Sequence, residues 1–127
     1  MAYLKPPWFV TNVFNRVARL TGIGGSQTLT ITRRASGEPQ RIPVVVPVVD
    51  GVRYLVSTRG ESQWVRNVRV NPVIWLGKDR YRACEVPVER RAPIIAAYRP
   101  LAGKVVDEYW RELPDDVDHP VFALAPE

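Results

Sequence analysis

The dipeptide Asp50-Gly51 constrains the fold more than any other feature of this 127-residue chain. It lies between Val48-Val49 and the alternating run over residues 52–56. An Asp-Gly pair between two such runs is typical of a two-residue hairpin of the primed type, because both turn positions need a positive φ. The pattern predicts that a strand over residues 41–49 pairs with a strand over residues 52–56.

Further short strands follow from the same kind of alternation. Leu29 and Ile31 share one face of a strand over residues 27–33, and Pro43 and Pro47 place part of the second strand at a sheet edge because proline has no N–H to donate. The remaining strands are predicted over residues 73–77, 80–88 and 119–125, and helices over residues 7–20, 62–70, 89–98 and 101–113. Pro100 is expected to end the helix over residues 89–98. About six strands joined mainly by turns predict a mostly β, α+β fold, a closed or split antiparallel barrel with appended helices.

The chain is short enough for one domain over residues 1–127, with a helix and a glycine-rich link in residues 1–25 and the barrel in residues 26–127. The helix over residues 7–20 is basic and amphipathic. Two interpretations are open: it caps the barrel or a dimer contact, or it lies on a membrane surface. No export signal or spanning segment is evident, so we expect a cytoplasmic protein, membrane-associated only if this helix binds lipid.

Several kinds of active site are excluded by composition. The chain has one histidine, His119, and one cysteine, Cys84, which cannot form a zinc site of the usual kinds or a hydrolase triad. Cys84 lies within a predicted strand, where a small packing residue is the ordinary finding. We therefore predict no metal site, and if the protein is an enzyme, its reactive group comes from an organic cofactor.

The basic residues indicate where an anionic cofactor would bind. The formal charge is +5, and most of the cations are arginines, which suit phosphate and carboxylate. Residues 32–37 combine two guanidinium groups, a hydroxyl and a glycine turn, and residues 57–60 repeat this chemistry after a strand. Trp64 and Asn67 share one face of a predicted helix and suit a ring-shaped ligand. The simpler alternative makes these segments polar turns and places Trp64 in the core.

Taken in order, these segments resemble the deazaflavin-dependent nitroreductase family. The resemblance covers roughly residues 26–126 and rests on the ordered set TITRRASGEPQRIP over residues 30–43, the Asp50-Gly51 hairpin, STRG over residues 57–60, Trp64-x-x-Asn67 with Asn71-Pro72, and HPVFAL over residues 119–124. It implies a split β-barrel that binds reduced coenzyme F420 and passes a hydride to an electron-poor acceptor. The expected acceptor is an enone, a quinone, or a nitro or lipid-like compound.

The resemblance also implies which residues form the site. The cofactor-binding set is Arg33, Arg34, Ala35, Ser36, Gly37, Arg41, Ser57, Thr58, Arg59, Gly60, Trp64 and Asn67. Thr58 is predicted to orient the cofactor and acceptor, and Tyr98 and Tyr109 are predicted by region to lie at the acceptor. Ala35 departs from the family pattern, in which a basic residue is common, and Arg59 replaces the usual lysine.

The same residues are compatible with other functions. Related split barrels bind flavins, so a flavin-mononucleotide (FMN) oxidoreductase is the first alternative, and a non-catalytic ligand-binding barrel is the second. A nucleic-acid module is not expected, because the arginines are dispersed and form no single stripe. We also expect a homodimer that covers an exposed sheet edge.

Overall fold

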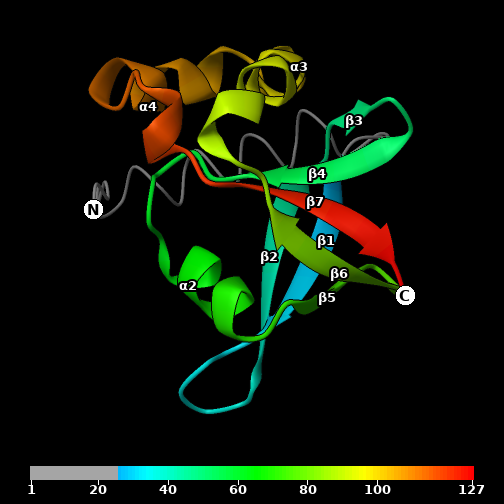
Figure 1. Cartoon of the computed structure of the whole chain (residues 1–127). Helices are drawn as coiled ribbons and strands as arrows, with labels where there is room; N and C mark the ends of the chain where they lie inside the picture. Colours follow the sequence, from blue (N-terminus) through cyan, green and yellow to red (C-terminus); the bar gives the residue numbers. More distant parts are fainter. Residues whose placement is uncertain (1–25) are drawn as a thin grey trace.

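Seven strands in residues 26–127, the part of the chain that the computed structural model describes, form one antiparallel sheet (Figure 1). The strands are β1 (Ser26–Thr32), β2 (Pro39–Val45), β3 (Val48–Val49), β4 (Val52–Val56), β5 (Val73–Leu76), β6 (Asp79–Glu85) and β7 (Val121–Pro126). They lie in the order β2-β1-β5-β6-β7-β4-β3. The helix predicted over residues 7–20, with the membrane contact assigned to it, lies outside the described residues.

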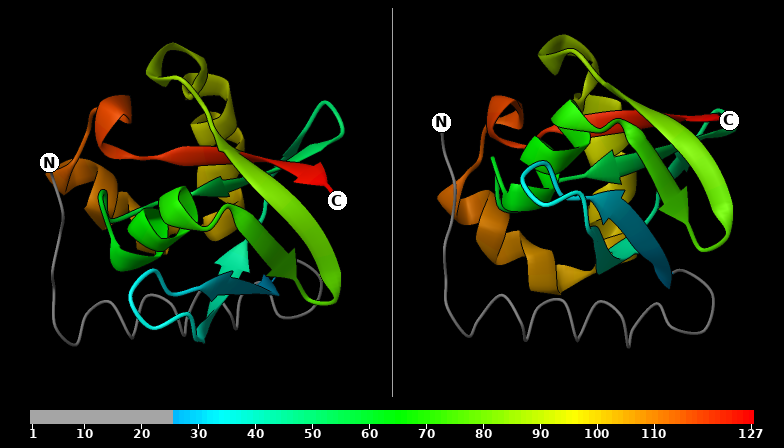
Figure 2. Two further views of the ribbon diagram at one scale, coloured as in Figure 1. Left: turned by 60° about the horizontal axis from the view of Figure 1, so that its bottom comes forward. Right: turned by 90° about the horizontal axis from the view of Figure 1, so that it is seen from below.

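The two outermost strands of the sheet are consecutive in the chain. β2 ends at Val45 and β3 begins at Val48, so only Val46 and Pro47 connect the two ends of the strand order. A link this short spans only about 10 Å. The sheet therefore curls until its ends approach each other, and the Tyr54 amide donates to the Pro47 carbonyl at 3.0 Å. Figure 2 shows this curl from two further sides. The curled sheet confirms the predicted split antiparallel barrel.

The predicted strand over residues 41–49 is wrong in one respect, because it is divided between the two ends of the sheet. Its first part pairs with β1, where Ile42 lies opposite Leu29, and only Val48 and Val49 pair with β4. The division falls at Pro47, which lacks an N–H for a ladder. The hairpin itself is confirmed, since Asp50 and Gly51 have φ values of 52° and 79°.

Three helices and three short 3₁₀ turns accompany the sheet in the described residues. They are α2 (Gln63–Val70), α3 (Ala92–Ala102), α4 (Asp107–Glu112), η1 (Val88–Arg90), η2 (Lys104–Val106) and η3 (Asp116–Asp118). Pro100 lies inside α3, so its predicted role as a helix end is wrong. The helix continues through Pro100 to the completely buried Ala102, and Gly103, with a φ of 85°, follows as its C-cap. No helix in residues 26–127 has the length and apolar character needed to cross a bilayer.

The sheet has a hydrophobic cluster on each face. Val121 of β7 packs with residues of α3 and α4, whereas its neighbours Phe122 and Leu124 pack with residues of α2, β1 and β5. Figure 1 shows α3 and α4 together on one side and α2 apart from them. Because alternate side chains of a strand point to opposite faces, β7 is buried on both. β4 likewise contributes Val56 to one cluster and Leu55 to the other, so β4 and β7 lie between the two clusters.

Alternation also explains an exposed cysteine. Tyr81 and Ala83 of β6 point into the core, so Cys84 points outward and is exposed. The expectation that Cys84 is a packing residue is wrong, because Tyr81 and Ala83 take the inward positions of β6.

Candidate functional site

One cleft is lined by the basic turn after β1 and by the polar face of α2. We call it the polar cleft. Its lining residues are Arg33, Arg34, Ala35, Ser36, Gln40, Gln63 and Asn67. The sequence analysis grouped five of these residues with the cofactor, and the structure brings those five together.

Arg34 is held in this cleft by neutral amide groups. Its Nη1 donates to Asn67 Oδ1 at 2.8 Å, its Nη2 donates to Gln63 Oε1 at 2.9 Å, and its backbone amide also donates to Asn67 Oδ1 at 3.0 Å. Asn67 in turn donates from Nδ2 to Gln40 Oε1 at 3.2 Å. Because these partners carry no charge, the guanidinium is oriented without being neutralised, which suits it to an anionic ligand.

The turn that carries these residues is closed by its own backbone. The Gly37 amide donates to the Arg33 carbonyl at 2.9 Å, and the Arg33 amide donates to the Glu38 carbonyl at 2.9 Å. Ser36 Oγ accepts from the Glu38 amide at 3.2 Å and keeps its own hydrogen to donate. Gly37 has a φ of 74°, and a Cβ there would meet no atom within 4 Å, so backbone conformation is the reason for glycine.

A second cleft, the apolar cleft, lies between β2, β4, α2 and α3. Its lining residues are Ile42, Pro43, Val44, Val45, Leu55, Val56, Thr58, Trp64, Tyr98 and Val106. The structure thus brings together Thr58, Trp64 and Tyr98, three predicted site residues that are distant in sequence. Trp64 also packs against Phe122 with ring centroids 5.9 Å apart, so it belongs to the core as well as to the cleft.

The two clefts share their walls. Gln40 of the polar cleft and Ile42 of the apolar cleft lie two residues apart on β2, and therefore on the same face of that strand. On α2, Gln63 and Asn67 line one cleft and Trp64 lines the other. An elongated ligand that follows β2 and α2 would pass from cationic to apolar surroundings.

The loop over residues 57–60 follows β4. We call it the cofactor loop because the sequence predicts that it contacts the cofactor. Ser57 is buried and donates from Oγ to the Gly60 carbonyl at 2.6 Å, while its amide donates to the Pro120 carbonyl at 2.9 Å. Gly60 has a φ of 79°, which closes the turn. Ser57 and Gly60 thus shape the loop, and Thr58 is its member that lines the apolar cleft.

Six predicted site residues line neither of these clefts. Gly37, Ser57 and Gly60 shape the two turns described above, and the other three are Arg41, Arg59 and Tyr109. Arg41 is exposed on β2 opposite Thr30, and Arg59 is half-buried in the cofactor loop. Tyr109 is only 2% exposed and packs in the cluster with α3. Tyr98 is the tyrosine that reaches the apolar cleft.

Burial governs the chemistry of Tyr98. Removal from water, with a smaller effect of Tyr109, raises the pKa of the Tyr98 hydroxyl far above its ordinary value. The phenol therefore stays protonated throughout the physiological range. It can donate a hydrogen bond or a proton at the edge of the cleft.

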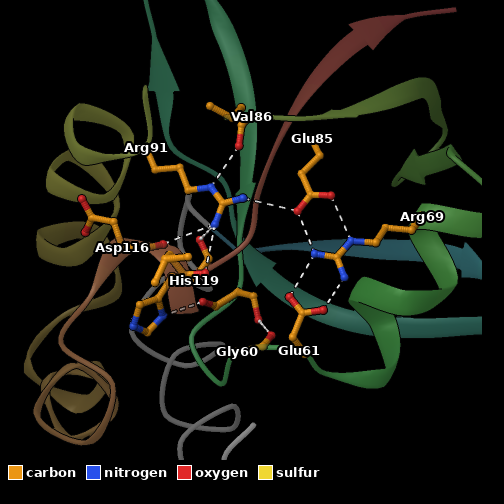
Figure 3. A network of polar contacts seen from close by, with 10 residues as sticks. Gly60, Glu61, Arg69, Glu85, Val86, Arg91, Asp116 and His119 are labelled. Carbon is orange, nitrogen blue, oxygen red and sulfur yellow. Dashed lines mark hydrogen bonds and ion pairs between the residues drawn. The ribbon is translucent and has the colours of Figure 1, made fainter. Parts of the chain in front are cut away.

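A chain of ion pairs lies behind the cofactor loop (Figure 3). Arg69 of α2 bridges Glu61 and Glu85, donating from Nη2 to Glu61 Oε2 at 2.9 Å and to Glu85 Oε2 at 2.7 Å. Arg91 contacts the same Glu85 oxygen at 3.3 Å and donates from Nε to the Val86 carbonyl at 2.9 Å. The hydrogen bond from Arg69 is the main cause of the lowered pKa of Glu61. This chain ties the residue after the cofactor loop to β6.

Sequence reasoning missed two residues of the polar cleft, Gln40 and Gln63. A signal for Gln63 was present, because it lies four residues before Asn67 and so on the same helix face. Gln40 lies opposite Ile31 in the first hairpin, and its contact with Asn67 appears only when α2 packs beside that hairpin.

The curled sheet defines a split-barrel fold, and similar solved structures share it. An F420-H2 dependent reductase is 24% identical, with a TM-score of 0.53, over 80% of this chain and 94% of that one. A FAD-binding protein from Mesorhizobium loti is 14% identical, with a TM-score of 0.56, over 89% and 88% of the two chains. A protein described as a domain-swapped dimer is 22% identical, with a TM-score of 0.57, over 92% and 96%.

The family follows from the sequence profile of the F420H2-dependent quinone reductases, which matches residues 9–113. The chain belongs to this family, so it is an F420-dependent oxidoreductase and coenzyme F420 is its cofactor. No protein with a curated description matches the chain significantly in sequence. The resemblance on which the sequence analysis relied is confirmed.

Proposed function

We propose that reduced coenzyme F420 lies along β2 and α2, with its anionic tail in the polar cleft and its ring beside Thr58 and Trp64. The observation that carries the proposal is the shared wall of the two clefts, with amide-oriented Arg34 at one end and apolar side chains at the other. The cofactor has a phosphodiester and a glutamyl tail, both anionic.

The residues present fit this group by the chemistry of their donors. Arg34 is positioned by amides and keeps its charge, Arg33 is exposed at the same cleft, and Ser36 retains a hydroxyl hydrogen. Guanidinium and hydroxyl donors are those that phosphate and carboxylate accept best. Ala35 adds no charge to the turn, so the two arginines and Ser36 carry tail binding.

The cofactor supplies the hydride, and the protein positions it and manages the proton. Thr58 Oγ1, in the wall of the apolar cleft, orients the ring or the acceptor by a hydrogen bond. Tyr98 stays neutral because of its burial and offers its hydroxyl hydrogen to the reduced acceptor. The apolar lining excludes water from the reacting atoms.

The acceptor that this lining favours is an electron-poor, uncharged molecule. Valine, leucine, isoleucine and tryptophan side chains supply most of the wall, and no acidic or basic side chain is among the lining residues of the apolar cleft. Such a cleft selects an enone, a quinone, or a nitro or lipid-like compound over a charged metabolite.

Titration of the purified chain with F420, followed by tryptophan fluorescence, tests the proposal. Trp64 lies in the apolar cleft and should be quenched on binding. Arg34→Ala should weaken binding by about 10- to 100-fold, as expected for a charge-assisted contact. The matched control is Arg82→Ala, since Arg82 is exposed on β6 and pairs with Glu127 at 3.0 Å.

FMN serves as the competing ligand in the same titration. Tight binding of FMN with none of F420 would contradict the proposal and favour a flavin oxidoreductase. Binding of F420 without oxidation by any enone, quinone or nitro compound would indicate a cofactor-binding barrel that does not turn over.

The proposal includes a homodimer, and two observations support it. A structural neighbour of the same fold is described as a domain-swapped dimer, and Val48 is 55% exposed on β3 at one end of the sheet. Covering such an edge protects its unpaired backbone groups. Light scattering coupled to size exclusion should give a mass of two chains, and a single-chain mass would contradict the dimer.

A further inference from the structure

His119, the single histidine of the chain, is completely buried where β7 approaches the cofactor loop. Its Nδ1 lies 2.9 Å from the Ser57 carbonyl oxygen, and its Nε2 lies 2.6 Å from the Leu113 carbonyl oxygen. The ring stacks on Trp110 with centroids 4.0 Å apart and planes at 8°. The imidazole thus joins the first residue of the cofactor loop to the residue that ends α4.

Hydrogen-bond chemistry restricts the form of this ring. Both partners are carbonyl oxygens, which accept and cannot donate. A neutral imidazole has one N–H, so one of its nitrogens would face a carbonyl with lone pair against lone pair. Only the doubly protonated ring donates to Ser57 and Leu113 together. A buried mismatch of this kind is costly because water cannot relieve it.

The surroundings of the ring accommodate a positive charge. The face of Trp110 attracts cations, and the Leu113 carbonyl lies at the C-terminal end of α4, the negative end of a helix dipole. Two cations lie close by, and each has a carboxylate partner. Arg91, whose Nη1 lies 3.4 Å from the His119 carbonyl oxygen, pairs with Glu85. Arg99, whose guanidinium lies 5.1 Å from the Trp110 ring centroid, pairs with Asp107. Other charged residues on the elements around the ring are Arg59, Arg111, Glu112, Asp115, Asp116 and Asp118. Within residues 26–127, neither ring nitrogen contacts a carboxylate.

Ser57 is fixed from three directions. The Ser57 carbonyl faces the His119 ring. The Ser57 amide donates to the carbonyl of Pro120, which follows His119 in the chain, and the Ser57 hydroxyl donates to the Gly60 carbonyl. Thr58 follows directly and lines the apolar cleft. A change at the imidazole is therefore transmitted to Thr58 through a single peptide unit.

We propose that His119 is a positioning residue, protonated on both ring nitrogens, that holds the cofactor loop in the conformation that binds F420. This inference rests on the proposed function for its ligand. A ring that carries only one of these protons leaves one carbonyl without its donor, so the hold on Ser57 loosens and F420 affinity falls.

The protonation can be read in the cofactor-free protein. Long-range ¹H–¹⁵N spectra of labelled protein contain one imidazole, because the chain has one histidine. At about pH 6 we expect two ring nitrogens with nearly equal shifts, as in an imidazolium. Two widely separated shifts, typical of a single neutral tautomer, at every pH between about 5.5 and 8 would overturn the proposal. This result does not depend on F420.

The positioning role is tested by F420 affinity across the same pH range. The wild-type chain should lose affinity as the imidazole spectrum changes, with the Thr58 amide signal shifting in parallel. His119→Gln, which offers donors from one amide only, should bind about tenfold more weakly at the acidic end, about 1.4 kcal/mol, and show no such pH dependence. Identical pH profiles for both proteins would overturn the role.

Two outcomes separate this inference from the proposed function. If His119→Gln does not fold, the wild-type spectra and pH profile still decide. If the wild-type chain binds no F420 at any pH, the proposed function fails. The inference about His119 is then tested by the Thr58 amide signal alone. A shift of this signal that parallels the change in the imidazole spectrum supports the inference, and an unchanged signal overturns it.

Discussion

At the scale of single residues, Arg34 and Arg69 differ in whether their hydrogen-bond partners are charged. Arg34 is oriented by amide oxygens of Gln63 and Asn67, whereas Arg69 is neutralised by two carboxylates. A neutralised guanidinium stabilises the fold, and an oriented but uncompensated one attracts an anion. This distinction separates Arg34, the cation proposed to bind the cofactor, from Arg69, the structural cation.

The role of Asn67 follows from that orientation. Asn67→Ala should weaken F420 binding by about 3- to 10-fold, because Arg34 loses two contacts to Oδ1. In an Arg34→Ala background, the same substitution should have little further effect, since the two residues act as one unit. Fluorescence titration of both single variants and the double variant measures the coupling. Fully additive losses would contradict it.

Tyr98 predicts a loss of stability in alkali. Its pKa is raised in the fold, so the folded chain holds its proton above the pH at which the unfolded chain releases it. The contribution of Tyr98 to the free energy of unfolding is therefore fully present below the unfolded tyrosine pKa of about 10. It declines above that pH, by about 1 kcal/mol at pH 11. In denaturant titrations, Tyr98→Phe should lack this part of the decline. Tyr54→Phe, at a half-buried tyrosine, is the control, and equal declines in both variants would contradict the assignment.

At the scale of elements, the chain is organised by short connections whose charges and backbone angles are fixed. The ion-pair chain from Glu61 through Arg69 and Glu85 to Arg91 ties α2, β6 and the start of α3 together (Figure 3). Its geometry depends on three segments that meet only in the folded state. Its contribution is therefore to tertiary structure.

Arg69→Gln should destabilise the protein by about 1–3 kcal/mol, and Glu61→Gln by less, because Arg69 serves two carboxylates and Glu61 serves one cation. The lowered pKa of Glu61 adds a pH dependence: its stabilisation is present above the ordinary carboxyl pKa and is lost as the pH falls through the lower folded value. Denaturant titrations near neutral pH and below about pH 4 measure both effects. A larger loss in Glu61→Gln than in Arg69→Gln would argue against the bridge.

The hairpin between β3 and β4 predicts a purely conformational cost. Gly51 has a φ of 79°, and a Cβ at that position would meet no atom within 4 Å. Gly51→Ala should therefore cost about 1–2 kcal/mol through backbone strain alone. Thermal unfolding measures it, with Lys78→Ala in the neighbouring exposed turn as the control. An unchanged melting temperature would mean that the turn adopts another type.

At the scale of the whole molecule, the curl of the sheet places the polar and apolar clefts along shared walls. Ligand contacts along β2 and α2 join the first hairpin to the helix, so a bound ligand should stabilise the fold as a unit. F420 at about 100 times its dissociation constant should add about 2.7 kcal/mol. Melting temperatures with and without cofactor measure this. At the same F420 concentration, the gain should fall to about 0.4–1.4 kcal/mol in Arg34→Ala, as its weaker binding requires, and persist in Arg82→Ala.

The sequence by itself determined the strand class, the Asp50-Gly51 hairpin and the dependence on a deazaflavin cofactor, because turn residues, alternation and ordered motifs are local properties of the chain. Only the tertiary structure shows that residues 41–49 are split between two strands at opposite ends of the sheet, and that α3 continues beyond Pro100. It also decided that Asn67 orients Arg34 and that His119 faces Ser57. These contacts join residues far apart in sequence, and their energies exist only once the sheet has curled and α2 has packed beside it.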